Sequence, residues 1–334
     1  MRQVDAATTR RLLPLGALVE ALRAMFVAGC EVPLRGTYPV GADATLLLMP
    51  AWQPGRRLGV KTVTIFPGNG ALGLPGLHST YLLFDAMTGV PLAQLDGNEI
   101  TSRRTAAAAA LAASYLARAD ARRLLIVGAG RVAGLVAEAM RTVRPIDSVV
   151  VWNHRPASAR ALAASLRGDG IEAHATEHLE VAVREADIVS CATLATAPLV
   201  RGAWLRAGTH LDLIGSFTPT MREVDADCFA RCRVFVDTPE ALAKSGDVLG
   251  ALATGAFDAA KLQGTLAELC AGTRPGRADM EERTLFKAVG SALEDLAAAE
   301  LVWDGLQRES LSSVPSTPDR DRPGVAASPS RAPE

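Results

Sequence analysis

The stretch Leu124-Leu125-Ile126-Val127-Gly128-Ala129-Gly130-Arg131-Val132-Ala133 decides the fold. Four consecutive apolar residues predict a buried strand, and residues 132–143, after the glycine loop, predict a helix. Gly128 permits the tight turn, Gly130 has no Cβ to block a pyrophosphate, and Ala133 allows close packing of helix on strand. The free N–H groups at the start of such a helix bind phosphate. The stretch therefore predicts a dinucleotide-binding loop rather than a purely structural turn.

Strands and helices alternate after this loop. Strands are expected at 148–152, 171–175, 187–191, 210–214 and 233–236, and a helix is expected at 157–166. Alternation of this kind is typical of a parallel sheet covered by helices on both faces. We therefore expect an α/β fold whose Rossmann-type doubly wound domain spans residues 119–283.

Residues 1–118 follow a different pattern. A helix is expected at 15–26, strand-like runs follow at 45–49, 59–65 and 79–84, and an alanine-rich helix follows at 106–117. Strands without helices between them predict a separate, mainly antiparallel α+β domain for substrate binding and dimerisation. Apolar residues at helical spacing predict a last helix at 284–308 that completes this domain. Residues 309–334 are rich in Ser, Pro and Arg, and we expect them to be disordered.

Composition excludes several classes of function. The net charge is −1 and only 4% of the 334 residues are aromatic, which argues against nucleic acid and anionic membranes as partners. No apolar run is long enough to span a bilayer, and the five scattered cysteines argue against a disulfide framework. The pairs Cys228/Cys232 and His174/His178 have no second pair at ligand spacing, so we expect no metal. A cytoplasmic location is expected.

The end of the second predicted strand, Trp152-Asn153-His154-Arg155, distinguishes the cofactors. An NAD enzyme usually has an acid there, which would repel a 2′-phosphate. Arg155 can instead bind a phosphate with two hydrogen bonds. The alternative is that Arg155 is a plain surface residue, but the missing acid also favours a 2′-phosphate. NADP(H) is therefore favoured over NAD(H). The candidate cofactor contacts are Gly128, Ala129, Gly130, Arg131, Val132, Asn153, His154, Arg155 and Thr193.

Three cations of the first domain stand among apolar or small residues: Arg35, Lys61 and Arg104. A buried cation without an acidic neighbour needs an anion, which makes these residues candidates for binding substrate. Because Arg103 and Arg104 are adjacent, we expect only one of them to face inward. The alternative is that all three are surface cations.

Several stretches resemble the ornithine cyclodeaminase/mu-crystallin family. They are MPAW (49–52), GVKTV (59–63), LLFDAMTGVPLAQLDGNEITSRRTAAAAALAASYLA (82–117), IVGAGRVA (126–133) and LFKAVGSALEDLAAA (285–299). The resemblance implies a homodimer formed through the first domain, an active site between the domains, and an α-carboxylate held by Arg35, Lys61 and Arg104. The family includes ornithine cyclodeaminases, alanine dehydrogenases, opine-type synthases and reductases of cyclic ketimines.

The segment Gly215-Ser216-Phe217-Thr218-Pro219-Thr220-Met221-Arg222-Glu223-Val224-Asp225 separates these activities. The family's ornithine cyclodeaminases have an aspartate two residues after the glycine, where this chain has Phe217. A phenylalanine cannot pair with the substrate's second ammonium group, whose burial would then be costly. The segment is more similar to the family's reductases of Δ1-pyrroline-2-carboxylate.

We therefore expect NADPH-dependent reduction of a cyclic ketimine acid, Δ1-pyrroline-2-carboxylate or Δ1-piperideine-2-carboxylate, to L-proline or L-pipecolate. Lys61 and His78 are the candidates for protonating the imine, and the resemblance implies that His78 lies on the cleft side. The resemblance also implies that Asp295, in the last predicted helix, is a position shared by the family, with either a catalytic role or a role in orienting another residue. Alternatives are an alanine dehydrogenase, an ornithine cyclodeaminase, or a mu-crystallin-like NADP-binding protein without catalysis.

Overall fold

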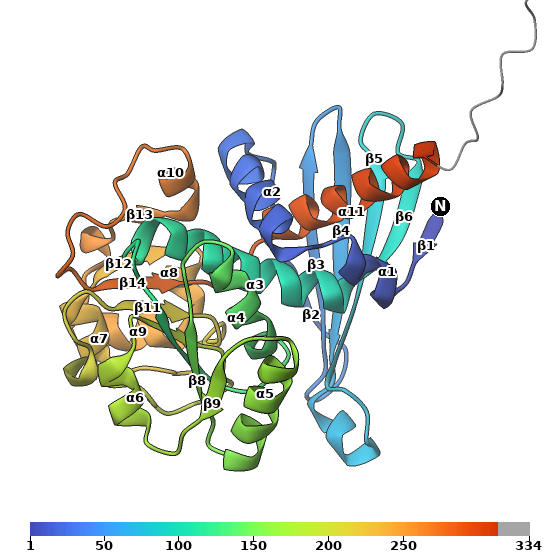
Figure 1. Cartoon of the computed structure of the whole chain (residues 1–334). Coiled ribbons are helices and arrows are strands. Elements are labelled where there is room, and N and C mark those ends of the chain that lie inside the picture. The colour runs from blue at the N-terminus through green and yellow to red at the C-terminus, as the bar shows by residue number, and fades with distance from the viewer. Residues whose placement is uncertain (313–334) are drawn as a thin grey trace, which may run out of the picture.

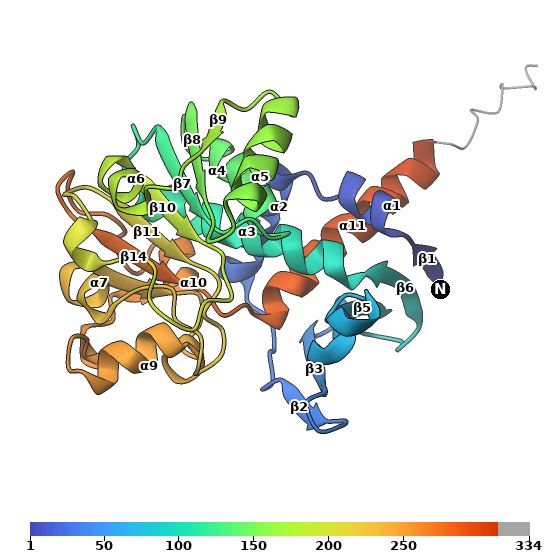
Figure 2. The same cartoon turned by 90° about the horizontal axis from the view of Figure 1, so that it is seen from below.

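The chain folds into two units, each built around one sheet. The computed structural model describes residues 1–312. One unit has a six-stranded sheet and the other an eight-stranded sheet, and Figure 1 shows them side by side. Helix α3 (Gly97–Leu116) packs against elements of both units, and in Figures 1 and 2 it lies between the two sheets. The predicted combination of an α/β unit with a second, mainly antiparallel unit is confirmed.

The first unit is a mixed sheet with strand order β1-β6-β5-β4-β3-β2. Its core is the antiparallel set β3–β4–β5–β6, and β1 pairs with β6 in parallel. The three predicted strands are present and longer than expected, because antiparallel pairing extends β3 at its end, β4 at its start and β5 at both ends. The bounds are β1 Arg2–Val4, β2 Gly36–Pro39, β3 Thr45–Gln53, β4 Arg57–Ile65, β5 Leu77–Asp85 and β6 Pro91–Asp96, with a 3-10 turn η1 at Pro67–Leu72 and helices α1 Ala6–Arg11 and α2 Leu15–Ala28.

Helix α3 begins nine residues before the predicted alanine-rich helix. The carboxylate of Asp96 accepts a hydrogen bond from the backbone N–H of Glu99 at 2.8 Å, which satisfies one of the unpaired donors of the first turn. Gly97 is required next, since a Cβ there would come within 2.6 Å of the backbone of Ser79. The early start brings Thr101 and Arg104 onto the helix.

The second unit is an all-parallel sheet with strand order β13-β12-β14-β11-β10-β7-β8-β9. Its strands are β7 Arg123–Val127, β8 Ser148–Trp152, β9 Ala173–Ala175, β10 Ile188–Cys191, β11 His210–Leu213, β12 Arg233–Val236, β13 Gly264–Thr265 and β14 Thr284–Lys287. Its helices are α4 Ala133–Arg141, α5 Pro156–Gly168, α6 Leu179–Glu185, α7 Ala226–Arg231, α8 Ala241–Lys244, α9 Gly246–Ala253 and α10 Leu266–Cys270, with 3-10 turns η2 Gly202–Trp204 and η3 Ala259–Lys261. The predicted alternation of strand and helix is confirmed.

The predicted last helix is wrong over its first residues. Thr284–Lys287 forms β14, which fills the gap between β11 and β12 in the parallel sheet. Helix α11 (Ala292–Ser312) starts only after Gly290, whose φ of +78° is incompatible with a continuing helix. As expected, α11 packs on the first unit, against α2, α3, β3 and β4. Of the tail predicted to be disordered, residues 309–312 belong to α11, and residues 313–334 lie outside the described part.

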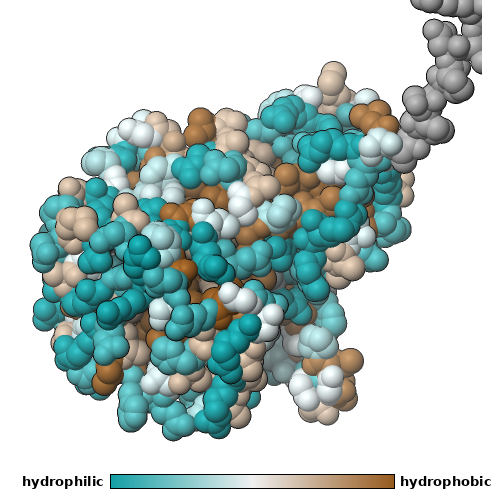
Figure 3. Space-filling view, in the orientation of Figure 1, coloured by the Kyte–Doolittle hydropathy of each residue, from teal (hydrophilic) through white to brown (hydrophobic). Residues whose placement is uncertain are grey.

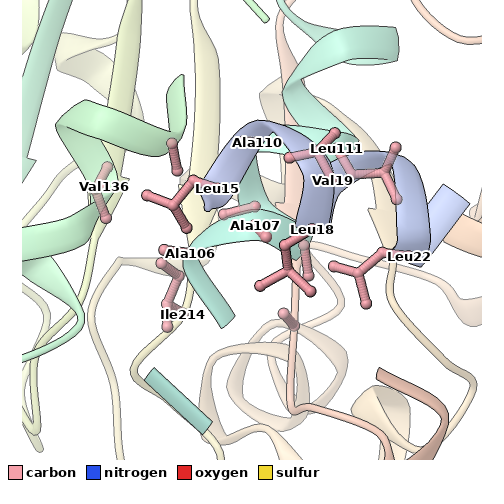
Figure 4. Packing of buried hydrophobic residues seen from close by; sticks show 14 of the residues in the cluster. Leu15, Leu18, Val19, Leu22, Ala106, Ala107, Ala110, Leu111, Val136 and Ile214 are labelled. Carbon is pink, nitrogen blue, oxygen red and sulfur yellow. The ribbon is translucent and has the colours of Figure 1, made fainter. Parts of the chain in front are cut away.

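The core is continuous from one unit to the other. Leu15, Leu18 and Leu22 of α2 pack against alanines of α3, and Figure 4 shows Val136 of α4 and Ile214 in the same cluster. Alanine side chains let helices approach closely, which explains why α3 is so rich in this residue. The tight packing of α3 fixes the two units relative to each other.

The surface is hydrophilic over most of the face shown in Figure 3, with hydrophobic residues in small patches. Within residues 1–312, no helix has the length and apolar character needed to cross a membrane.

Candidate active site

A cavity of about 380 Å³ lies where the two units meet. It is bounded by β3, β4 and α3 of the first unit, by the glycine loop and the loops after β10 and β11, and by the segment between β14 and α11. Its described lining residues are Arg35, Leu47, Met49, Lys61, Val63, Ile65, Leu77, Thr101, Arg104, Thr105, Ala108, Gly130, Arg131, Val132, Ala192, Thr193, Leu194, Ile214, Gly215, Phe217, Ala288, Val289, Gly290 and Glu294. The cavity therefore joins the predicted cationic residues to the predicted dinucleotide loop.

All three predicted cations line this cavity. Lys61 is 2% exposed and projects from the same face of β4 as Val63, while Arg104 is 6% exposed on α3. Arg35 is less buried, and its Nη2 donates a hydrogen bond to the carbonyl of Gly290 at 2.8 Å. The alternative of three surface cations is therefore wrong.

Two acids of α11 hold Lys61 and Arg104 in place. The Nζ of Lys61 lies 2.9 Å and 2.7 Å from the two carboxylate oxygens of Asp295. The Nε of Arg104 donates to Asp295 at 3.0 Å, and its Nη1 donates to Oε2 of Glu294 at 2.6 Å. Asp295 was identified from the sequence and Glu294 was missed. Two adjacent acids in the first turn of α11, directly before the apolar run 296–299, are the feature that could have revealed both.

Burial dominates the electrostatics of this cluster. Burial lowers the pKa of Lys61 to about 8, although the charge of Asp295 opposes the change. Burial likewise raises the pKa of Glu294 to about 7, against the opposing charge of Arg104. Burial would also raise the pKa of Asp295, but Lys61 and Arg104 outweigh it and hold that pKa below its ordinary value. Asp295 is therefore the permanent anion of the cluster.

Arg103 and Arg104 are both buried, but only Arg104 faces the cavity. The Nε of Arg103 donates to the carbonyl of Leu13 at 2.6 Å, and its Nη2 lies 3.7 Å from Glu138. Adjacent helical positions point in directions about 100° apart, which separates the two side chains. Both side chains therefore point into the protein, but only Arg104 points into the cavity, as expected for one of the two.

The glycine loop has the shape that a dinucleotide requires. Gly128 has φ +123°, and a Cβ there would lie 2.5 Å from the carbonyl oxygen of Ala192. A Cβ on Gly130 would have no neighbouring heavy atom within 4 Å, so the space beside this residue is open. The loop leads directly into α4, and the start of a helix is the end at which phosphate groups bind. Gly130, Arg131 and Val132 also line the cavity.

The residues predicted to select the cofactor lie beside this loop, outside the cavity lining. Trp152 ends β8, which pairs with β7, and its carbonyl accepts a hydrogen bond from Gly128 N–H at 2.8 Å. Asn153, His154 and Arg155 follow in the connection to α5, and Arg155 is exposed. Residues at the carboxyl end of the strand next to the glycine loop are positioned for an adenosine ribose.

A buried glutamate that the sequence analysis missed connects two loops of the cavity. The carboxylate of Glu223 accepts hydrogen bonds from the backbone N–H and hydroxyl of Thr193, at 2.7 and 2.9 Å, and from Gly215 N–H at 2.7 Å. Thr193 follows β10 and Gly215 follows β11. Glu223 thus fixes the wall that carries the predicted contact Thr193.

His78 does not reach the cavity. His78 of β5 pairs with Thr64 of β4, whereas the neighbouring residues Leu77 of β5 and Ile65 of β4 line the cavity. Successive strand residues point to opposite faces of a sheet, so His78 faces away, and it is exposed. The expectation that His78 lies on the cleft side is wrong within this chain.

Phe217 lies in the loop after β11 and lines the cavity with 41% of its surface exposed. Among the described lining residues Glu294 is the one acid, and its Oε2 is already bound to Arg104. The loop after β11 therefore contributes no carboxylate to the described lining.

A model of the ornithine cyclodeaminase/mu-crystallin family matches residues 4–310. The chain belongs to this family. The resemblance noted in the sequence is thereby confirmed over nearly the whole described chain.

Known members of the family are similar along their full length. A Delta(1)-pyrroline-2-carboxylate reductase from Paracoccus denitrificans (strain Pd 1222) is 42% identical over 294 residues, which are 85% of this chain and 90% of that protein. The structure of Thermococcus litoralis Delta(1)-pyrroline-2-carboxylate reductase in complex with NADH and L-proline matches with a TM-score of 0.88 at 33% identity, over 93% of this chain and 98% of that one. An archaeal alanine dehydrogenase dimer with bound NAD matches with a TM-score of 0.86 at 28% identity, over 92% and 96%.

Proposed function

We propose that this chain is an NAD(P)H-dependent imine reductase that converts a cyclic ketimine acid, Δ1-pyrroline-2-carboxylate or Δ1-piperideine-2-carboxylate, to L-proline or L-pipecolate. The proposal rests on one cavity lined by Lys61, Arg104 and Phe217 together with the glycine loop. The reductases of Paracoccus denitrificans and Thermococcus litoralis support the same substrate class.

The cations bind the α-carboxylate of the substrate. Arg35, Lys61 and Arg104 converge on the cavity from a loop, a strand and a helix, so a carboxylate bound among them has one favoured orientation. That orientation presents the C=N carbon toward the glycine-loop side of the cavity. A bound nicotinamide supplies the hydride on that side.

Lys61 and Asp295 act as a unit. Both short contacts of the Lys61 ammonium are to Asp295, which itself does not line the cavity. Asp295 is therefore a positioning residue that aims Lys61 and keeps it charged. Phe217 provides an apolar wall for the ring and, unlike an aspartate, offers no partner to a second ammonium group, which disfavours ornithine.

NADPH is the proposed reductant. The end of β8 has no acid to repel a 2′-phosphate, and Arg155 is exposed beside the glycine loop. The two solved relatives named above hold NADH or NAD, so the preference is a proposal about this chain's own residues.

Replacement of Arg155 by glutamate is expected to lower kcat/KM for NADPH about tenfold, because a charge-assisted hydrogen bond to phosphate is lost. The same variant should change kcat/KM for NADH much less. Arg160→Glu is the matched control, since Arg160 lies on α5, the helix that follows Arg155, and pairs with Glu177 on the surface. Equal losses for both cofactors, or a wild type that prefers NADH, would contradict this assignment.

The function itself is tested by supplying each imine with NADPH and following the absorbance of the reduced nicotinamide. Oxidation that yields L-proline or L-pipecolate is the expected result. Three outcomes would redirect the assignment. Proline formation from ornithine would indicate a cyclodeaminase, ammonia-dependent reduction of pyruvate an alanine dehydrogenase, and tight NADPH binding without any turnover a binding protein.

We also propose a homodimer formed through the face of the six-stranded sheet that points away from the cavity. Alternate residues of β3, β4 and β5 make this face apolar and only partly buried within one chain, and the archaeal relative is a dimer. A molar mass of one chain by light scattering would contradict the proposal. The apolar residues of this face are Leu46, Leu48, Leu58, Val60, Leu82 and Phe84.

A further inference from the structure

Glu294 is a fully buried acid that opens onto the cavity. Its Oε2 accepts the hydrogen bond from Arg104 at 2.6 Å, whereas its Oε1 has no hydrogen-bond partner among the described residues. A buried polar atom without a partner is costly, so a proton or a ligand atom is expected at Oε1. The carboxyl therefore has one oxygen fixed by the protein and one oxygen available.

The charges of the cluster balance before substrate arrives. Lys61 and Arg104 carry two positive charges, and Glu294 and Asp295 carry two negative charges when both are ionised. Arg35 is less buried and lies 3.4 Å from Glu240, which also pairs with Lys244, so the balanced part of the site is the buried set of two cations and two acids. A substrate carboxylate would add a net negative charge to this buried site, which is unfavourable unless another negative charge is removed.

We infer, on the basis of the proposed function, that Glu294 takes up one proton when the substrate carboxylate binds and gives this proton to the imine nitrogen during reduction. Asp295 is unsuited to this role because it bridges both cations through its Oδ1. Glu294 meets one cation through a single oxygen and keeps Oε1 for the proton.

The step balances in atoms and electrons. The imine carbon accepts a hydride, with its two electrons, from the reduced nicotinamide, and the imine nitrogen accepts H⁺ from Oε1 of Glu294. The C=N double bond becomes a CH–NH single bond, the nicotinamide is oxidised and Glu294 is left as a carboxylate. Glu294 regains a proton from solvent when the next anion binds.

Five charged groups surround Glu294. Arg104 on α3 and Lys61 on β4 favour its ionised form, whereas Asp295 on its own helix and Asp237 after β12 favour its neutral form, and Arg35 lines the same cavity. Burial is the largest influence and raises the pKa of Glu294 to about 7. Because binding selects the neutral acid, affinity is full below pH 7 and falls as the pH rises above it.

The inference is tested by binding pyrrole-2-carboxylate to the NADP⁺-loaded protein in calorimetry. This probe carries the carboxylate on a planar ring but has no basic nitrogen, so any proton taken up goes to the protein. The binding enthalpy is measured at pH 7.5 in buffers that differ in ionisation enthalpy, and its dependence on the buffer gives the number of protons taken up per site. Wild type is expected to take up most of one proton per site, and its dissociation constant should rise about fivefold from pH 7 to pH 8.

Glu294→Gln keeps the size and shape of the side chain but removes the carboxyl group that can take up a proton. It is expected to take up little proton, to bind the probe with a dissociation constant that changes less than about twofold between pH 7 and pH 8, and to lose at least tenfold in kcat with the imine. Glu294→Asp should restore part of the uptake, and Glu240→Gln, at the rim beside Arg35, should leave it intact.

Unchanged proton uptake in Glu294→Gln, absence of uptake in the wild type, or failure of the probe to bind would each overturn the inference. The test does not depend on turnover. If proton uptake depends on Glu294 but neither imine is reduced, the inference about Glu294 stands and the proposed reaction fails. If an imine is reduced but proton uptake does not depend on Glu294, the proposed reaction stands and the inference fails.

Discussion

Replacement of Arg104 by alanine is expected to lower kcat/KM for the imino acid by about 100- to 1,000-fold, mostly through a higher KM. Removing one partner of a buried, hydrogen-bonded charge pair typically costs about 2–5 kcal/mol. Arg104 is the cavity residue that contacts both Glu294 and Asp295, so its loss removes an anchor for the carboxylate and leaves Glu294 with an uncompensated charge. Steady-state kinetics with the imine and NADPH measure the effect.

Arg103→Ala is the matched control for this change. Arg103 is equally buried and stands on the same helix, but it contacts Leu13 and Glu138 and does not line the cavity. Its removal is expected to lower the melting temperature and to leave KM unchanged in the folded protein. If Arg104→Ala folds and keeps a wild-type KM, Arg104 is not part of the carboxylate site.

Replacement of Gly130 by valine is expected to weaken dinucleotide binding by at least about 100-fold while leaving the melting temperature of the cofactor-free protein nearly unchanged. A Cβ at Gly130 would meet no heavy atom within 4 Å, so the protein itself tolerates the side chain. The added atoms would occupy the space through which the pyrophosphate approaches the loop. Fluorescence titration with NADPH and thermal unfolding measure the two quantities separately.

Gly128→Ala provides the contrast within the same loop. Gly128 has φ +123°, and its added Cβ would lie 2.5 Å from the carbonyl oxygen of Ala192. This variant is therefore expected to lose thermal stability even without cofactor. Two results would contradict this prediction. Either Gly130→Val lowers thermal stability as much as Gly128→Ala, or Gly130→Val binds NADPH with wild-type affinity, which would show that the dinucleotide does not occupy the space beside Gly130.

Local patterns predicted most of the second unit because its strands are short, apolar and separated by helices. Thr284–Lys287 shows where that approach fails. Its apolar residues fit helical spacing as well as a buried strand, and the decision rests on the space between β11 and β12, which only the folded sheet contains. Strand β6 and the first turns of α3 were missed for a similar reason, since pairing with β5 and capping by Asp96 define them.

The candidate site divides in the same way. Lys61 and Arg104 were found because a cation among apolar residues is unusual enough to stand out in a single segment. Glu294 was missed because its importance comes from Arg104, which is 190 residues away in the sequence. His78 was misplaced because the face to which a strand residue points depends on its register with neighbouring strands.

The sequence by itself determined the dinucleotide loop, the two-unit α/β architecture and the cations that we propose to bind an anion, because each depends on residues that are neighbours along the chain. The tertiary structure alone decided which acids neutralise those cations and which side chains line the cavity. Those relations depend on burial and on distances between α3, β4 and α11, which are set only when both units close around α3.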